Sequence, residues 1–531
     1  MKKIRLPFKI KLLFSPRERR QQIVGAGPRL ISYHASAYVT SGEIIKVYNT
    51  GYENMATVYI VDEGGRGLYI VDEPRVPEEV KNVYGLIMEH LSYSLKPAQV
   101  SNIEDYVKNL VWEAAEELGV VDIVEQHIKT LNYYIMRDVI GYGYIDVPMR
   151  DPLVEEISME GPGVPVAIVH RDVSNYTWLD TNIVIPSEEE AAVFVQKLAQ
   201  KCGKYISTAF PILEARSPEG HRIALALGEV SGRGSSFTIR KFPEKPLTIT
   251  QLIDYGTLSP LMAAYFWILL ENLAFILIIG GMATGKTTTL QALLTLGPPD
   301  YKYVTIEDTP ELRLPHTHWD PLYTRKGYTI GSSQLDIDLF ELTKFSLRRR
   351  GQYIVVGEVR GKEIQSLVQA AATGQGSMCT FHANSIEEAF LRITSPPLDV
   401  KPAFLMLIWS IVLMRRVRLK DGRVVRRMAK VWEITGLDLE SNKPIPLNYT
   451  EVFSWDPFTD SFKPDTPEEV ISRSYRLKQV AKASGLASNE LLEEIRIRAR
   501  YLEEMVKDKV FDYNDVSKRL FKYYKSKIKK N

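Results

Sequence analysis

The chain has 531 residues, of which 45% are hydrophobic and 25% charged. This ordinary globular composition excludes wholesale disorder and predicts about two to four domains. The two cysteines, Cys202 and Cys379, exclude a disulfide framework and a four-cysteine zinc site, and favour a reducing compartment. The net charge is +2, but residues 1–20 and 518–531 each carry +7, which leaves −12 on the rest of the chain.

Two interpretations of the basic ends stay open. They are attracted to anionic lipid headgroups or an acidic partner, or they are solvated ends that aid solubility. Apolar residues alternate with basic or small ones over residues 4–14, a pattern that suits an edge strand or a segment lying on a membrane. The N-terminus lacks the features of a secretory signal. The apolar segments 258–281 and 403–414 are interpreted as core helices or strands, so we expect a soluble protein.

The first half of the chain predicts two α/β domains. Residues 29–92 alternate strand-like segments with one helical segment, residues 103–140 are mainly helical, and residues 151–241 mix both patterns. We therefore expect a basic tail with a small α/β domain over residues 1–100, and a second α/β domain over residues 101–241.

The second half predicts a nucleotide-binding architecture. Two prolines and a break in periodicity indicate a hinge linker at residues 242–256. Over residues 257–531, apolar strands alternate with helical segments, which predicts a parallel, RecA-like sheet. Asp421-Gly422 predicts a hairpin and an antiparallel extension, and the last 65 residues predict helices.

The strongest motif is GGMATGKTTTL, which begins at Gly280 between a short apolar run and a helical segment. Strand, glycine-rich turn and helix are the context that a P-loop requires. Its backbone N–H groups cradle phosphate, Lys286 reaches the outer phosphates, and Thr287 can ligate Mg²⁺. The predicted nucleotide-binding residues are Gly280, Gly281, Met282, Ala283, Thr284, Gly285, Lys286, Thr287 and Thr288. The protein is expected to bind a nucleoside triphosphate.

Three more segments carry polar residues at the ends of predicted strands. TIEDTPEL contributes Glu307, an acid placed to orient water or hold Mg²⁺. QYIVVGEVRG delivers Glu358 as a Walker B acid, with Gly357 where many ATPases carry a first acid. ATGQGSMCTFHANS ends a further strand at His382, which could sense the γ-phosphate. Solvated loop acids and a structural histidine are the alternatives.

The order of these four boxes resembles that of the secretion-system ATPases, which power type II secretion, type IV pili and the archaellum. The resemblance covers roughly residues 100–440. It implies a PAS-like N-terminal α/β region and a RecA-like domain. Lys286 and Thr287 would bind phosphate and Mg²⁺, Glu307 would activate water, Glu358 would serve as the Mg²⁺-side acid, and His382 would be the histidine-box residue.

The segment HRIALALGEVSGRGSSFTIRKF looks like the part of these enzymes that supplies cationic groups. Arg222, Arg233 and Arg240 are the candidate arginine fingers, with Arg222 and Arg240 favoured among the three; a structural role in packing or pairing is the alternative for each. The sequences GEVRG and GSSFTIRKF look like the archaeal branch of the family. Two departures, Gln375 in place of a first histidine and Gly351-Gln352 before the Walker B strand, put the turnover rate in doubt.

The resemblance implies a cytoplasmic ATPase that uses ATP and Mg²⁺ and forms a homo-hexamer at the inner face of the membrane. It would drive a polytopic membrane platform protein that assembles pilin-like subunits into a filament. The basic first 20 residues would help it dock on an anionic membrane. Two alternatives remain: a DNA-transfer or nucleic-acid motor, which the acidic core disfavours, and a slow ATP-binding ring scaffold.

Overall fold

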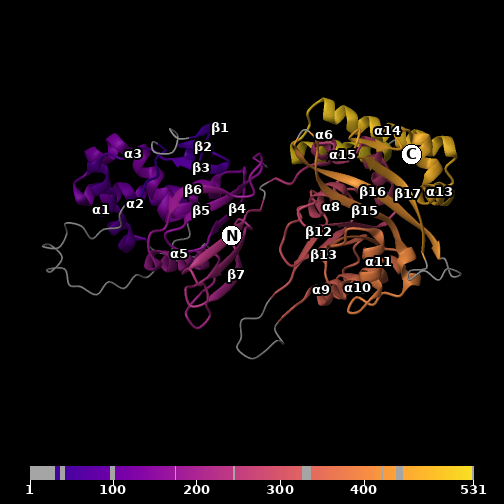
Figure 1. Cartoon of the computed structure of the whole chain (residues 1–531), viewed down its shortest axis with the longest axis horizontal. Helices are drawn as coiled ribbons and strands as arrows, with labels where there is room; N and C mark the ends of the chain where they lie inside the picture. Colours follow the sequence, from indigo (N-terminus) through magenta and orange to yellow (C-terminus); the bar gives the residue numbers. More distant parts are fainter. Residues whose placement is uncertain are drawn as a thin grey trace. The chain divides into compact units, whose positions relative to one another are not determined.

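In the computed structural model, the described residues are 30–35, 42–95, 102–173, 175–242, 245–325, 336–420, 422–437 and 447–528. The chain divides into two compact units, residues 1–244 and residues 245–531. Each unit is built around its own nine-stranded sheet (Figure 1). The alternating basic segment predicted at residues 4–14 lies outside the described residues.

The sheet of the first unit is almost entirely antiparallel, in the order β1-β2-β3-β6-β5-β4-β9-β8-β7. Its one parallel pair joins β3 to β6. The strands are β1 (Glu43–Thr50), β2 (Ala56–Glu63), β3 (Arg66–Asp72), β4 (Val154–Met159), β5 (Pro165–His170), β6 (Leu179–Val184), β7 (Ile212–Arg216), β8 (Arg222–Ala226) and β9 (Ser236–Arg240).

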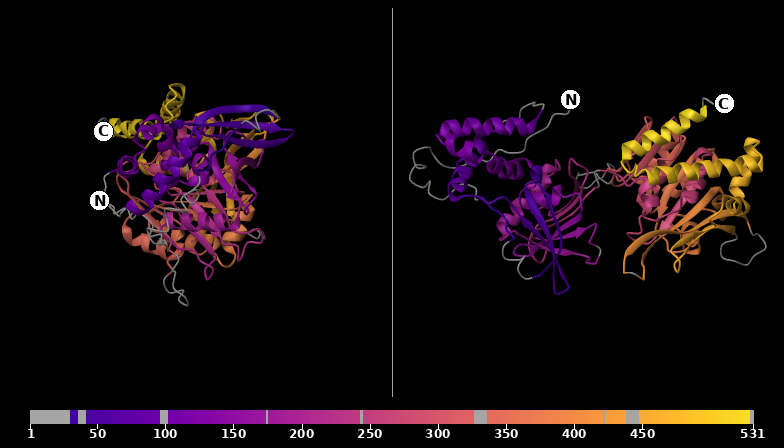
Figure 2. Two further views of the ribbon diagram at one scale, coloured as in Figure 1. Left: turned by 90° about the vertical axis from the view of Figure 1, so that its left-hand side faces the viewer. Right: turned by 90° about the horizontal axis from the view of Figure 1, so that it is seen from above.

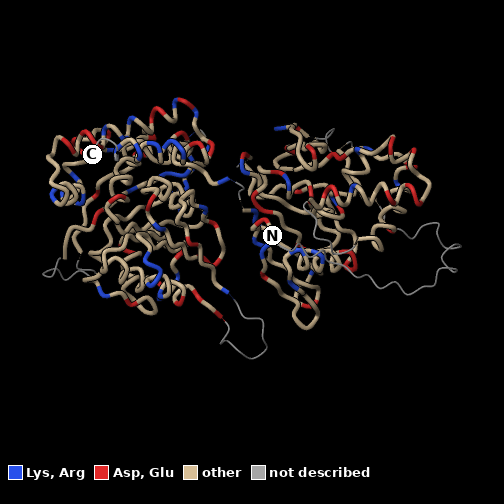
Figure 3. The backbone as a smooth tube through the Cα atoms, turned by 180° about the vertical axis from the view of Figure 1, so that it is seen from behind, with Lys and Arg blue, Asp and Glu red and all other residues tan. Residues whose placement is uncertain are grey.

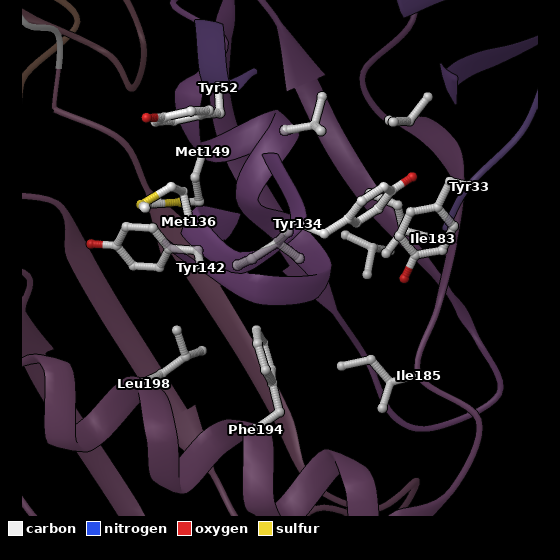
Figure 4. Packing of buried hydrophobic residues seen from close by; sticks show 14 of the residues in the cluster. Tyr33, Tyr52, Tyr134, Met136, Tyr142, Met149, Ile183, Ile185, Phe194 and Leu198 are labelled. Carbon is white, nitrogen blue, oxygen red and sulfur yellow. The ribbon is translucent and has the colours of Figure 1, made fainter. Parts of the chain in front are cut away.

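The helices of this unit are α1 (Glu78–Ser94), α2 (Ile103–Leu118), α3 (Val121–Ile135), α4 (Asp146–Arg150) and α5 (Glu188–Lys201). One hydrophobic core joins them to the sheet. In Figure 4, Tyr134 near the end of α3, Ile183 from β6 and Phe194 from α5 belong to the same cluster of buried residues. The sequence predicted a division at residue 100, whereas the β3–β6 pair and this shared core join residues on both sides of that position.

The second unit has the sheet order β12-β11-β13-β14-β10-β15-β16-β17-β18. The first six strands are parallel, and the last three continue from β15 as an antiparallel extension, as the sequence predicted. The strands are β10 (Phe275–Gly280), β11 (Tyr303–Glu307), β12 (Trp319–Tyr323), β13 (Tyr353–Val359), β14 (Gly376–Phe381), β15 (Ile408–Arg418), β16 (Val424–Leu437), β17 (Leu447–Asp456) and β18 (Ser461–Lys463).

Helices cover both faces of this sheet. One face carries α6 (Ile249–Asp254), α7 (Pro260–Glu271), α8 (Lys286–Leu294), α12 (Pro467–Arg473), α13 (Tyr475–Ser484), α14 (Ser488–Lys507) and α15 (Tyr513–Ile528). The other carries α9 (Leu339–Ser346), α10 (Glu363–Ala372) and α11 (Ile386–Thr394). Figure 1 shows the sheet between these layers, and the right-hand view of Figure 2 shows α14 and α15 (yellow) lying over the second unit.

The predicted linker at residues 242–256 is shorter in the structure. The boundary between the units falls after residue 244. Helix α6 begins within the predicted linker, and its Ile249 and Leu252 are buried in the core of the second unit. Thr250 also donates a hydrogen bond to the carbonyl of Val510, at 2.7 Å. Residues 249–254 therefore belong to the second unit.

Candidate nucleotide-binding site

The P-loop connects the buried strand β10 to helix α8, in the strand–turn–helix context that the sequence predicted. Glycine is required at its first position, because a Cβ on Gly280 would lie 2.6 Å from the carbonyl oxygen of Met414. Gly285 precedes the helix at φ 88°, in the left-handed region. The N–H groups of the first turn of α8 therefore open towards the loop, as phosphate binding requires.

The side chain of Lys286 forms a hydrogen bond within the P-loop. Its Nζ donates a hydrogen bond to the carbonyl of Gly281 at 2.7 Å, and the hydroxyl of Thr284 donates to the same oxygen at 3.0 Å. Burial lowers the pKa of the Lys286 ammonium, and the opposing charge of Glu358 raises it. The ammonium and the Walker B carboxylate therefore lie within electrostatic reach of each other, although they come from motifs 72 residues apart.

Glu358 lies near the carboxyl end of β13, and its side chain is 37% exposed. Arg360 donates to Glu358 Oε2 from Nε at 3.1 Å and from Nη2 at 2.5 Å. The same guanidinium lies 4.0 Å from Asp308. Arg360 therefore bridges the Walker B acid and the acidic box, a pairing that sequence spacing did not predict.

Glu307 lies beside Gly357, the position at which many ATPases carry a first acid. Strands β11 and β13 run parallel with Ile306 opposite Val356, so Glu307 follows next to Gly357. A Cβ on Gly357 would lie 3.0 Å from Glu307 Cγ. The absence of a side chain at residue 357 is therefore matched by a carboxylate from the neighbouring strand.

The Glu307 side chain is 3% exposed and also organises the following loop. Its Oε1 accepts hydrogen bonds from the backbone N–H groups of Glu311 and Leu312, at 2.8 and 3.0 Å. Glu307 thus has a structural function in addition to the predicted one of orienting water.

His382 directly follows β14, at the same carboxyl edge of the sheet as the P-loop. Its carbonyl accepts a hydrogen bond from Arg392, while its imidazole makes no hydrogen bond to the described residues. The side chain that approaches the P-loop is Asn384, since a Cβ on Gly281 would lie 3.3 Å from Asn384 Oδ1. The sequence analysis missed Asn384, although it stands two residues after the predicted histidine.

The two departures from the family pattern lie at the opposite edge of the sheet. Gln375 immediately precedes β14, and its side-chain amide donates to the carbonyl of Gly351 at 3.0 Å. Gln352 accepts from the N–H of Lys302 at 2.7 Å. Because β14 is six residues long, Gln375 lies roughly 20 Å from the P-loop edge. Neither departure touches the phosphate site.

The three candidate arginine fingers separate into two groups within the first unit. Arg222 and Arg240 are directly opposite each other on β8 and β9. Each lies 3.9 Å from a carboxylate, of Glu214 and Glu156 respectively. Arg233 lies in the turn beyond the other end of this hairpin, roughly 13 Å or more along the strands. Arg233 therefore lies apart from the other two candidates within the first unit.

Arg426 is a further P-loop neighbour that sequence reasoning missed. Its Nε donates to the carbonyl of Ala283 at 3.0 Å, from strand β16. Ala283 has φ 55°, in the left-handed region that disfavours residues other than glycine. The contact therefore supports the loop where its backbone is strained. The only sequence signal was the arginine-rich hairpin on either side of Asp421-Gly422.

A sequence profile for the family described as "Type II/IV secretion system protein" matches residues 184–419. An uncharacterized protein of Methanocaldococcus jannaschii is 33% identical over 484 residues, covering 86% of this chain and 85% of that protein. The chain belongs to the type II/IV secretion system ATPase superfamily. The assignment made from the order of the four boxes is thereby confirmed.

Other members of this secretion ATPase superfamily match smaller parts or match more weakly. A Mycobacterium tuberculosis protein whose name refers to conjugal transfer is 32% identical over 215 residues, 39% of this chain and 60% of that protein. The ATPase DotB of Legionella pneumophila has 16% identity and a TM-score of 0.39, covering 80% of this chain and 97% of its own. Among the described residues of this chain, no helix combines the length and the apolar character needed to span a bilayer.

Proposed function

We propose that this protein hydrolyses ATP with Mg²⁺ and, as a homo-hexamer, couples hydrolysis to the assembly of a type IV pilus-like or archaellum filament. The observation that supports the enzymatic part is the meeting of three motifs at one edge of the sheet. Lys286 in the P-loop lies within electrostatic reach of Glu358, and Glu307 packs beside Gly357 on the adjacent strand. Superfamily membership supports the coupling to a secretion or pilus machine.

The residues at this edge fit a metal that is bound together with nucleotide. Among the described residues, no three His, Cys, Asp or Glu side chains gather to hold a metal ion by themselves. Mg²⁺ usually takes one or two protein ligands plus phosphate oxygens and water. Thr287, whose hydroxyl makes no hydrogen bond to the described residues, and Glu358 would supply those ligands. When bound, the ion neutralises charge on the phosphates.

In the proposed mechanism, Lys286 leaves the carbonyl of Gly281 and binds the outer phosphates. Glu307 holds and deprotonates the attacking water. Arg360 holds the Glu358 carboxylate, which would also be a ligand of the bound metal. Arg222 and Arg240 neutralise charge on the transferred phosphoryl group when a first unit approaches the site, which makes hydrolysis depend on domain or subunit movement.

A DNA-transfer motor is the second candidate, because the relative from M. tuberculosis bears a name that refers to conjugal transfer. Acidic and basic residues are interspersed along both units in Figure 3, which favours the filament motor over one that tracks a phosphate backbone. DNA-stimulated hydrolysis by the purified protein would support this second candidate.

The enzymatic proposal is tested by phosphate release from the full-length protein. Lys286→Ala and Glu358→Gln should each lower kcat/KM for ATP by at least a hundredfold, while Lys302→Ala, a lysine at the opposite edge of the sheet, should not. Wild-type rates in the first two variants would show that the site is assigned wrongly. Deleting the gene and imaging cells by electron microscopy tests the coupling, since a specific surface filament should disappear.

A further inference from the structure

Two arginines on the β15–β16 hairpin flank the P-loop on the side away from Glu358. In the order β13-β14-β10-β15-β16, the Walker B strand and this hairpin lie on opposite sides of the P-loop strand. Met414 on β15 and Met428 on β16 are paired, and both are buried in the core that includes α8. Arg416 and Arg426, two residues further towards the hairpin turn, are also paired. They therefore share the face of the sheet on which α8 lies.

Arg426 shows that this face reaches the phosphate loop. It hydrogen-bonds the carbonyl of Ala283, and a Cβ on Gly285 would lie only 3.2 Å from Arg426 Cδ. On β15, the strand that pairs with the P-loop strand β10, Met414 is the register partner of Gly280. Arg416 therefore lies about 6.6 Å beyond the level of Gly280, alongside the P-loop itself.

No acidic side chain among the described residues neutralises the charge of Arg416. The residue is exposed and, among the described residues, it has no ion pair or hydrogen-bonded partner for its side chain. By contrast, Arg427 on the same hairpin is buried and forms two hydrogen bonds of 2.8 Å to Asp460. A guanidinium beside an anion site offers a planar fork of donors that matches phosphate oxygens.

We propose that Arg416 binds the phosphate chain of the nucleotide from the β15 side, opposite Lys286 and Glu358. The inference rests on the proposed function, since it presumes that nucleotide occupies the P-loop. It adds a binding residue that none of the four sequence boxes contains. Arg426, whose Nε is engaged by the loop, keeps the role of supporting Ala283.

Arg415 is a matched control because it is adjacent on the same strand. It carries the same charge and is also exposed without an acidic partner among the described residues. Its side chain lies on the other face of the sheet, where it lines a cavity with Asn384 and Trp432. Neutralising Arg415 therefore changes the net charge of the hairpin by the same amount without removing a group from the α8 face.

The experiment is a titration of the full-length protein with a fluorescent ADP analogue. Arg416→Gln should weaken binding about tenfold or more, as expected for a lost charge-assisted hydrogen bond. Arg415→Gln should change it less than about twofold, and Arg416→Lys should restore part of the affinity. The thermal unfolding midpoint without nucleotide should be unchanged in all three variants.

If Arg416→Gln and Arg415→Gln bind ADP with equal affinity while Lys286→Ala abolishes ADP binding, this inference is overturned. The proposed function is then left intact. Failure of Arg416→Lys to improve on Arg416→Gln would also overturn it. If the wild-type protein itself does not bind ADP, the proposed function fails together with the inference.

Discussion

Replacing Glu307 separates the two functions that its carboxylate combines. In Glu307→Gln the side-chain amide oxygen can still accept from the N–H groups of Glu311 and Leu312, which lie 2.8 and 3.0 Å from Oε1 in the wild type. The variant loses only the proton-accepting group. In Glu307→Ala both the base and the acceptor are lost, and the two backbone N–H groups lose their partner.

The magnitudes follow from these contacts. Loss of a general base lowers rates by about 10² to 10⁴-fold, so both variants should lose at least a hundredfold in kcat. Hydrogen bonds to a charged acceptor contribute about 1.5 kcal/mol or more each. Glu307→Ala should therefore lower the free energy of unfolding by about 3 kcal/mol, and Glu307→Gln by about 1 kcal/mol. Phosphate release and urea unfolding measure the two quantities on the same samples.

Two outcomes would refute the reasoning in different places. A wild-type kcat in Glu307→Gln would remove Glu307 as the base. Equal unfolding free energies for the Gln and Ala variants would show that the carboxylate does not stabilise the loop. Asp308→Asn is a suitable control, because Asp308 is adjacent to Glu307, about half exposed, and lies 4.0 Å from Arg360.

Two further predictions concern buried basic side chains of the second unit. Burial lowers the pKa of His316 to about 4 from 6.5, so between these pH values the unfolded chain binds a proton that the folded chain does not. The contribution of His316 to the free energy of unfolding is complete above pH 6.5 and decreases by about 3 kcal/mol as the pH drops to 4. In urea titrations, this pH-dependent contribution should be absent from His316→Gln. It should be retained in His318→Gln, a change at an exposed position. Arg498 is 1% exposed and lies 2.7 Å from Glu271. Changing Arg498 to Met should lower the free energy of unfolding by about 3–5 kcal/mol, because two carboxylates lose their buried partner. Arg496→Met on the exposed face of α14 should cost less than about 1 kcal/mol, and an equally small loss in Arg498→Met would contradict the argument.

The sequence alone was sufficient for the local features of the nucleotide-binding unit. Its parallel strands are short apolar runs that end in functional residues, so strand, turn and helix could be assigned at Gly280 to Thr288 without tertiary information. The apolar stripe Leu491, Ile495, Leu502 and Met505 predicted the buried face of α14, and all four residues are buried. The hairpin at Gly422 followed from turn chemistry. These features depend on periodicity and backbone preference, which a sequence displays directly.

The sequence was less informative about the first unit. The short strands β4, β6 and β7 were not singled out, since each has only five or six residues and two of them carry several charged side chains. The pairing of β3 with β6 joins residues more than 100 positions apart, so no local pattern could indicate that strands β1 to β9 form one sheet. The division predicted at residue 100 takes no account of this pairing.

Only the tertiary structure decided how the site is assembled. It brings Glu307 beside Gly357, so that one strand supplies the acid missing from another, and it moves Gln375 to the far edge of the sheet. It also places Arg426 on the P-loop from a hairpin 140 residues later in the chain. A sequence displays residue types and spacing, whereas strand order and register determine which side chains meet. The motifs therefore identified the phosphate loop, and the order of the strands determined its neighbours.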